Sequence, residues 1–247
     1  MASSDEKNMR GKTAFITGGG RGIGQAVACA YAQAGARVFI CGREPAAVEK
    51  TAGEIRSAGG EIDGRTGDIG NAADAARLVR AALERFGAID VLVNNASILG
   101  PRVPVAEYPL EAWEDVVRIN LNGLFFVTRA ALPAMLARRS GSIINVSSGV
   151  GRTGKARWGA YAVSKAGVEN FTQVLADEVK DAGIRVNAVN PAATRTEMRA
   201  SAYPDEDPMT LPTPAEITPV FLYLATDGSA HITGKSLEAR DWLRRSD

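Results

Sequence analysis

The chain has 247 residues, of which 45% are hydrophobic, so it is long enough to bury one substantial core within a single α/β domain. The formal net charge is +1 and the charged residues are spread along the chain, which argues against a nucleic-acid-binding or membrane-surface protein. The single histidine, His231, and the two separated cysteines, Cys29 and Cys41, lack the spacing of metal ligands. We therefore predict no metal site.

The same sequence features predict the cellular compartment, and we expect a cytoplasmic protein. Residues 1–8 are polar with mixed charge, unlike a signal peptide, and no apolar run looks long enough to span a membrane. Cys29 and Cys41 are then interpreted as small buried residues in a reducing compartment.

The first predicted element is a short apolar strand that starts at Thr13 and leads into a glycine-rich turn, followed by a helix over 25–32. Gly18, Gly22 and Gly24 can adopt backbone angles that a Cβ forbids, and they let main-chain N–H groups approach a phosphate. The helix start adds unpaired N–H groups and a partial positive charge. Taken alone, the spacing fits an ordinary tight turn as well as a nucleotide site.

The rest of the chain alternates strands with helices. Gly35 ends the first helix, Pro45 begins the second, and Asn71 caps the third. This alternation implies right-handed crossovers and a parallel sheet, with no sign of a second domain. The further strands are predicted at 36–41, 62–66, 89–93, 143–146, 184–189 and 235–238, and the further helices at 46–58, 72–86, 113–135 and 161–179.

The two long helices at 113–135 and 161–179 carry apolar residues on more than one face. A helix that covers a sheet needs only one apolar stripe, so the excess indicates a second burial partner. That partner is either another subunit or a neighbouring helix of the same chain, and the sequence leaves both open.

Tyr161 and Lys165 stand four residues apart, so on a helix their side chains lie on one face within reach of each other. A neighbouring ammonium favours the phenolate and lowers the pKa of a tyrosine, which otherwise is about 10. Such a pair can move a proton to or from a substrate oxygen. The bare pattern is also common on exposed helix faces.

Other polar residues fall on the same rim as the glycine turn. Asn94-Asn95-Ala96 closes one predicted strand and Ser147-Ser148 closes the next, where parallel strands place ligands. Asn120 interrupts a helical stretch with a side chain that can hold a water or a backbone carbonyl.

Taken together, these residues resemble the short-chain dehydrogenases/reductases in their compact single-domain form. Ser148 lies thirteen positions before Tyr161, as the family pattern requires, which favours Ser148 over Ser147. The resemblance implies a Rossmann-like doubly wound α/β fold, with a parallel sheet of about seven strands and helices on both faces, in one domain over 1–247. The motifs that carry it are Thr17-Gly18-x-x-x-Gly22-x-Gly24, Asp68-Ile69, Asn94-Asn95-Ala96, Asn120, Ser148, Tyr161-x-x-x-Lys165 and Asn190-Pro191.

The resemblance also implies a role for each site residue. Tyr161 is the general acid or base, Lys165 lowers its pKa and holds the nicotinamide ribose, and Ser148 hydrogen-bonds the substrate oxygen. Asn120 supports a water relay, and Asn94 packs near the glycine turn and ties strands together. Asp68 and Ile69 lie by the adenine. The expected cofactor contacts are Gly18, Arg21, Gly22, Ile23, Gly24, Arg43, Asp68, Ile69, Asn95, Ala96, Tyr161, Lys165, Pro191, Thr194 and Thr196.

The end of the second strand predicts the cofactor. NAD-preferring relatives carry an acidic residue there, whereas this chain has Gly42 followed by Arg43. Arg43 and Arg21 supply two guanidinium groups that suit a 2′-phosphate, so NADP(H) is expected over NAD(H). The alternative is that both are ordinary surface arginines.

Several positions depart from the family pattern. Ser97 and Ala192 stand where glycines are usual, the substrate lid over 195–214 is short, and 239–243 replaces the usual Asp-Gly-Gly sequence. The last change is expected to alter a subunit contact or the pocket edge.

The predicted function is that of an NADP-dependent oxidoreductase acting on a small carbonyl or alcohol substrate, with 3-oxoacyl thioester reduction as the nearest subclass. The expected assembly is a homodimer or homotetramer. Alternatives are a non-catalytic NADP-binding regulator or scaffold, and an epimerase or dehydratase on a nucleotide sugar, for which the C-terminal part is short.

Overall fold

The computed structural model describes residues 8–243. Within this range the chain forms a seven-stranded parallel sheet with the order β3-β2-β1-β4-β5-β6-β7. The predicted doubly wound sheet is confirmed. The strands are β1 (Thr13–Thr17), β2 (Arg37–Gly42), β3 (Ile62–Thr66), β4 (Val91–Asn94), β5 (Gly141–Val146), β6 (Ile184–Asn190) and β7 (Ser236–Glu238).

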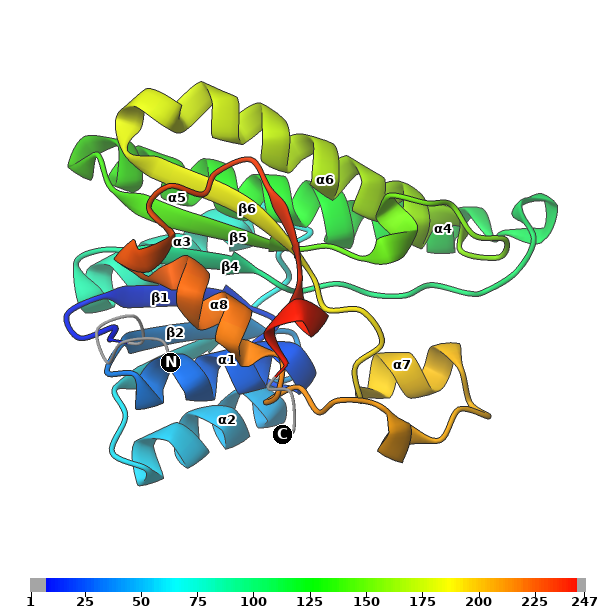
Figure 1. Ribbon diagram of the computed structural model, residues 1–247, viewed down its shortest axis with the longest axis horizontal. Coiled ribbons are helices and arrows are strands. Elements are labelled where there is room, and N and C mark those ends of the chain that lie inside the picture. Colours follow the sequence, from blue (N-terminus) through cyan, green and yellow to red (C-terminus); the bar gives the residue numbers. More distant parts are fainter. Residues whose placement is uncertain (1–7, 244–247) are drawn as a thin grey trace.

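Helices cover both faces of the sheet, and each face has its own apolar core (Figure 1). One core joins the sheet to α1 (Gly22–Gln33), α2 (Pro45–Ser57) and α8 (Thr218–Ala225). The other joins it to α3 (Ala72–Phe86), α5 (Gly123–Arg138) and α6 (Gly159–Val179). Two shorter helices, α4 (Leu110–Val117) and α7 (Glu197–Ala202), lie beyond the carboxyl ends of the strands (Figure 1).

The boundaries of α3 follow from its capping residues. Asn71 Oδ1 accepts hydrogen bonds from the amides of Ala73 (2.9 Å) and Asp74 (3.1 Å), which satisfies two N–H groups of the first turn. Gly87 ends the helix with a φ of 78°, a left-handed conformation that glycine adopts without strain. The predicted helix over 72–86 is therefore confirmed at both ends.

Some predicted boundaries were wrong by a few residues. The strand predicted at 89–93 begins at Val91, and the Asp90 carboxylate just before it accepts the Thr13 amide at 2.8 Å. The helix predicted at 113–135 runs from Leu110 to Arg138, and a π-helical turn over Arg118–Asn122 joins α4 to α5. The extra residue in that turn lets the helix continue through Asn120, where the sequence indicated an interruption.

The same helix corrects the expectation about apolar length. Within residues 8–243, Leu110–Arg138 is long and apolar enough to cross a membrane by length and composition alone, with a mean hydropathy of 1.3. In this fold one side of its α5 half packs against α3 and the sheet, which accounts for the buried part of its apolar residues. Residues 1–7, on which the argument against a signal peptide depended, lie outside the described residues, as do residues 244–247.

Candidate active site

The glycine turn forms a tight cradle between β1 and α1. Gly18 and Gly22 have φ values of +65° and +56°, which L side chains rarely adopt. A Cβ on Gly24 would lie 2.2 Å from the Gly18 carbonyl oxygen. Arg21 precedes α1 without a side-chain cap, so no side chain takes up the first N–H groups of the helix. This arrangement fits the pyrophosphate of a dinucleotide.

The chain reverses its strand order between β1 and β4, where ligands of such sheets bind. Thr17 Oγ1 accepts the amides of Asn95 and Ala96, both at 3.0 Å. Asn95 Nδ2 donates to the carbonyls of Thr17 (2.9 Å) and Gly18 (3.2 Å). These bonds hold the residues after β4 against the glycine turn.

Asn94 has a different position from the one expected. Its Nδ2 donates to Thr128 Oγ1 on α5 and to Asn145 Oδ1 on β5, both at 2.9 Å. It therefore ties strands together, as predicted, but Asn95 rather than Asn94 contacts the glycine turn. The side chain of Asn94 points to the opposite face of the sheet from that turn, because adjacent residues of a strand alternate in direction.

Tyr161 and Lys165 lie on the first turns of α6, with 9% and 3% of their surfaces exposed. Lys165 Nζ lies 5.5 Å from the centre of the Tyr161 ring and donates to the Val146 carbonyl at 2.8 Å, at the end of β5. Ser148 stands two residues further on, and its side chain lowers the pKa of Tyr161. Ser147 Oγ is buried without a partner. The choice of Ser148 over Ser147 agrees with this geometry.

The electrostatics of the pair differ from the expectation. Burial raises the pKa of Tyr161 to about 12, and the hydrogen bond with Ser148 opposes that rise. Burial lowers the pKa of Lys165 to about 8, and the nearby Glu169 carboxylate opposes that fall. In this arrangement burial is the largest influence on the pKa of each of the two residues.

Asn120 sits in the π-helical turn with 2% of its surface exposed. Its Oδ1 accepts the Ile98 amide at 2.8 Å, and its Nδ2 donates to the Ile98 carbonyl (2.9 Å) and to Ser164 Oγ (3.1 Å). Ser164 lies between Tyr161 and Lys165 on α6. Asn120 therefore joins the loop after β4 to the helix that carries Tyr161 and Lys165, and the carbonyl it holds is that of Ile98.

The remaining predicted cofactor residues surround the same crevice. Ile23 packs on the core beneath α1 and Ile69 on the core of the other face. Asp68 accepts a hydrogen bond from Arg118 Nη1 at 2.6 Å, and the charge of Arg43 also acts on its carboxylate. Pro191 and Thr194 are buried after β6, where Thr194 Oγ1 donates to the Pro191 carbonyl at 2.9 Å.

Thr196 and Arg21 connect the segment over 195–214, predicted as the substrate lid, to the glycine turn. Thr196 Cγ2 lies 3.6 Å from where a Cβ on Gly22 would be, while its hydroxyl caps α7 through the Arg199 amide at 3.1 Å. Arg21 pairs with Glu197 at 3.1 Å across the same gap. The pair is exposed at both ends, so it contributes little to stability.

Comparison with known proteins decides the family. The sequence pattern of the short chain dehydrogenases matches residues 12–207. The chain belongs to the short-chain dehydrogenases/reductases. It is 40% identical to the uncharacterized oxidoreductase YciK of Escherichia coli K12, over 92% of this chain and 90% of that protein. It is 35% identical to a 3-oxoacyl-[acyl-carrier-protein] reductase of Synechocystis, over 91% and 94%.

Solved structures of the same family agree. A short chain dehydrogenase from Escherichia coli CFT073, complexed with NADPH, superposes with a TM-score of 0.91 at 38% identity, over 96% of this chain and 99% of that one. The expected family membership and oxidoreductase class are thus confirmed.

Sequence reasoning missed an acidic network next to Tyr161 and Lys165 of this short-chain dehydrogenase/reductase. Glu169 is 8% exposed and accepts the Ser236 hydroxyl at 2.9 Å. Arg152, in the turn after Ser148, lies 4.0 Å from Glu169 and pairs with Glu238 at the end of β7. Glu169 stands four residues after Lys165, so the helical period could have revealed it. No sequence signal links Arg152 to residue 238.

The departures from the family pattern have structural consequences. Ala192 has a φ of 55°, a left-handed conformation in which its Cβ is strained. The C-terminal change brings Trp242 onto Tyr223 of α8, with ring centres 4.6 Å apart. The residues after β7 therefore pack against the α1–α8 face of their own chain.

Proposed function

We propose that the chain is an NADP(H)-dependent reductase of carbonyl compounds. The observation that carries this proposal is the place of Tyr161 and Lys165 on α6, where Lys165 is bonded to the end of β5 and Ser148 acts on Tyr161, on the rim that also holds the glycine cradle. A module that only binds a nucleotide needs no buried proton donor at that point. The NADPH and NADP complexes of similar dehydrogenases support the cofactor.

Each side chain of the site has a separate role in the proposed reaction. Bound NADPH supplies the hydride, so the protein contributes position and electrostatics. Ser148 donates a hydrogen bond to the carbonyl oxygen of the substrate, and Tyr161, whose raised pKa keeps it protonated near neutrality, gives that oxygen its proton. The ammonium of Lys165 stabilises the phenolate left behind. Asn120 holds Ile98 and Ser164 around the pair, and it provides the start of a water path that returns the proton.

The test is NADPH oxidation against a panel of ketones, diketones, quinones, aldehydes and acetoacetyl thioesters, with Tyr161→Phe beside the wild type. Turnover by the wild type alone supports the proposal. The panel includes acetoacetyl thioesters because similar proteins are named 3-oxoacyl-[acyl-carrier-protein] reductases. Tight NADPH binding without any turnover would instead favour a binding regulator.

A preference for NADP(H) over NAD(H) is a further part of the proposal. Arg43 lies beyond the end of β2, where Gly42 leaves no carboxylate to repel a 2′-phosphate. Arg21 is paired with Glu197. Within residues 8–243, no carboxylate forms an ion pair with Arg43, so Arg43 is the guanidinium available for a 2′-phosphate. Michaelis constants for NADPH and NADH, measured with and without Arg43→Ala, test the preference. The wild type should favour NADPH and the variant should lose most of that preference.

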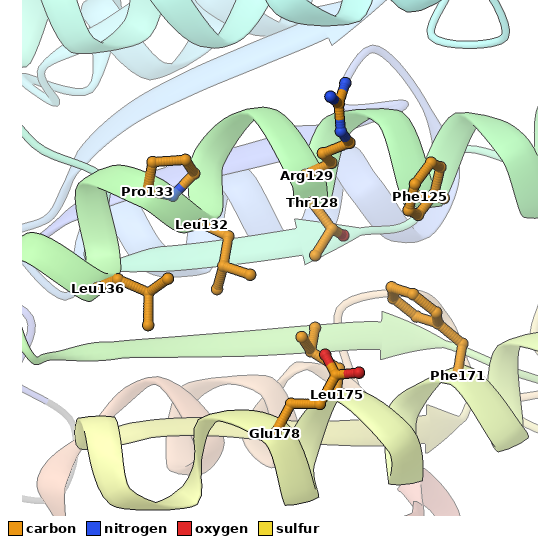
Figure 2. A pocket seen from close by; sticks show the side chains of 9 residues that line it. All are labelled: Phe125, Thr128, Arg129, Leu132, Pro133, Leu136, Phe171, Leu175 and Glu178. Carbon is orange, nitrogen blue, oxygen red and sulfur yellow. The ribbon is translucent and has the colours of Figure 1, made fainter.

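We also propose a homo-oligomer that buries the outer faces of α5 and α6. Figure 2 shows a groove between these helices, where Leu132 and Leu136 of α5 face Leu175 of α6. Phe125 (44% exposed) and Phe171 meet edge to face at its end, with ring centres 6.3 Å apart. Light scattering of the wild type and of Phe125→Glu tests this, and the variant should dissociate. A cytoplasmic location remains our expectation.

A further inference from the structure

The lid carries an aromatic ring surrounded by positive charge. Tyr203 follows α7, and the guanidinium carbons of Arg199 and Arg102 lie 3.8 Å and 4.5 Å from the centre of its ring. Lys155 Nζ lies 3.0 Å from the Tyr203 hydroxyl and 5.5 Å from the ring centre. Hydrogen bonding from Lys155, together with the charges of Arg102 and Arg199, lowers the pKa of Tyr203. Three segments distant in sequence thus place cations on one ring.

The charge of this group is only partly neutralised. Glu206 holds Arg199 through two hydrogen bonds, of 2.5 Å and 2.6 Å. Among residues 8–243, no carboxylate lies within ion-pair distance of Arg102 or Lys155. Arg102 instead donates to the backbone carbonyl of Ala202 at the end of α7. Two positive charges therefore share one ring without a counter-charge, an arrangement that an incoming anion would stabilise.

Trp158 connects this group to the reactive tyrosine. The Arg102 guanidinium lies 4.9 Å from the centre of the Trp158 ring, and that ring lies 5.6 Å from the ring of Tyr161. Arg102 is thus one aromatic side chain away from the proton donor. Trp158 is 8% exposed, and neither its Nε1 nor the Nε of Arg102 has a hydrogen-bond partner. Buried donors without acceptors are costly, so the polar groups between Arg102 and Trp158 are incompletely satisfied within residues 8–243.

We propose that Arg102 and Lys155 bind an oxyanion group of the substrate, a carboxylate or phosphate, while the carbonyl of the same molecule lies at Tyr161. This inference rests on the proposed reductase function and names its substrate class. The charge of the Arg102 guanidinium suits an oxyanion even while one of its N–H groups is bonded to the Ala202 carbonyl, and Lys155 adds a mobile charge at the exposed edge. The substrate is then a short oxoacid or a phosphorylated ketone rather than a neutral ketone.

The test measures binding without turnover. The full-length enzyme is saturated with NADP⁺, and isothermal titration calorimetry follows the addition of each probe. Acetoacetate, levulinate and 5-oxohexanoate vary the distance between carbonyl and carboxylate, and their methyl esters are the neutral controls. Dihydroxyacetone phosphate and dihydroxyacetone form the phosphate arm, which distinguishes the two oxyanion sources. Absence of NADP⁺ binding in the first titration would contradict the proposed function itself.

The variants are Arg102→Gln and Lys155→Met, with Arg80→Gln on the outer face of α3 as the matched control. At least one oxoacid should bind at least about ten-fold more tightly than its methyl ester, or dihydroxyacetone phosphate should bind at least about ten-fold more tightly than dihydroxyacetone. Arg102→Gln should remove most of that ratio, Lys155→Met part of it, and Arg80→Gln none. Circular dichroism and NADP⁺ affinity check that each variant folds. Because Lys155 is exposed, its variant tests the proposal even if Arg102→Gln is unstable.

Two results would overturn the proposal while leaving the reductase function intact. In the first, acids and esters bind equally to the wild type. In the second, Arg102→Gln weakens acids and esters by the same factor, which would show that Arg102 only fastens the lid to Trp158.

Discussion

Glu169 lies one helical turn beyond Lys165 on α6, and its buried carboxylate opposes the fall in the pKa of Lys165 that burial causes. Ser236 and Arg152 hold that carboxylate, from β7 and from the turn after Ser148. Glu169 is therefore a positioning residue for the charge of Lys165. In the proposed mechanism it keeps the ammonium protonated at the pH where that charge stabilises the phenolate of Tyr161.

The first prediction concerns the pH dependence of reduction. Lys165, with a pKa of about 8, should be charged below that pH and lose its proton above it, so kcat/KM should fall in alkaline solution. In Glu169→Gln the opposing charge is gone, so the fall should begin roughly one pH unit lower. Glu84→Gln, at an exposed site on α3, should keep the wild-type profile. An unchanged profile in Glu169→Gln would show that the carboxylate is only structural.

The second prediction separates the two serines at the end of β5. Ser148→Ala removes the hydroxyl that contacts Tyr161 and should lower kcat by about 10²–10³, as expected for the loss of one donor to the reacting oxygen. Ser147→Ala removes a buried hydroxyl that has no partner, so activity should stay within about two-fold of the wild type. Equal losses in steady-state assays of the two variants would contradict the assignment.

Sequence alone was enough to predict the sheet, the glycine turn and the Tyr161–Lys165 pair, because these follow from short-range periodicity and spacing. It assigned the glycine contact to Asn94 instead of Asn95, since a pattern does not show on which face a strand ends. It also missed the cations around Tyr203. Arg102, Lys155 and Tyr203 come from three loops about fifty residues apart, and loops have no periodicity from which their contacts can be predicted.

The third prediction concerns the strain at Ala192. A non-glycine residue with a φ of 55° costs about 1–2 kcal/mol, whereas glycine adopts this conformation freely but loses more chain entropy on folding. Ala192→Gly should therefore raise the free energy of unfolding by roughly 0.5–1 kcal/mol. Ala193 has no positive φ, so Ala193→Gly should lower it by about 0.4–1 kcal/mol. Urea midpoints at unchanged m-values measure both, and a destabilised Ala192→Gly would disprove the strain.

The last prediction tests the buried polar chain that links the sheet to α5 and α6. Asn145 is fully buried; it accepts from Asn94 and donates to Thr172 Oγ1, both at 2.9 Å. The Thr172 hydroxyl in turn donates to the Val168 carbonyl at 2.7 Å, which fixes the direction of the chain. Asn145→Ala leaves polar atoms of both neighbours without their partner and opens a small cavity.

The expected loss for Asn145→Ala is about 2–3 kcal/mol in the free energy of unfolding, measured by urea denaturation. Asn170→Ala, at an exposed position of α6, is the control and should stay within about 0.5 kcal/mol of the wild type. Thr172 lies on α6, the helix that also carries Tyr161 and Lys165. Asn145→Ala should therefore also lower kcat at temperatures where the variant remains folded. If Asn145→Ala lowers the free energy of unfolding by less than Asn170→Ala does, Asn94 and Thr172 form other hydrogen bonds in the variant.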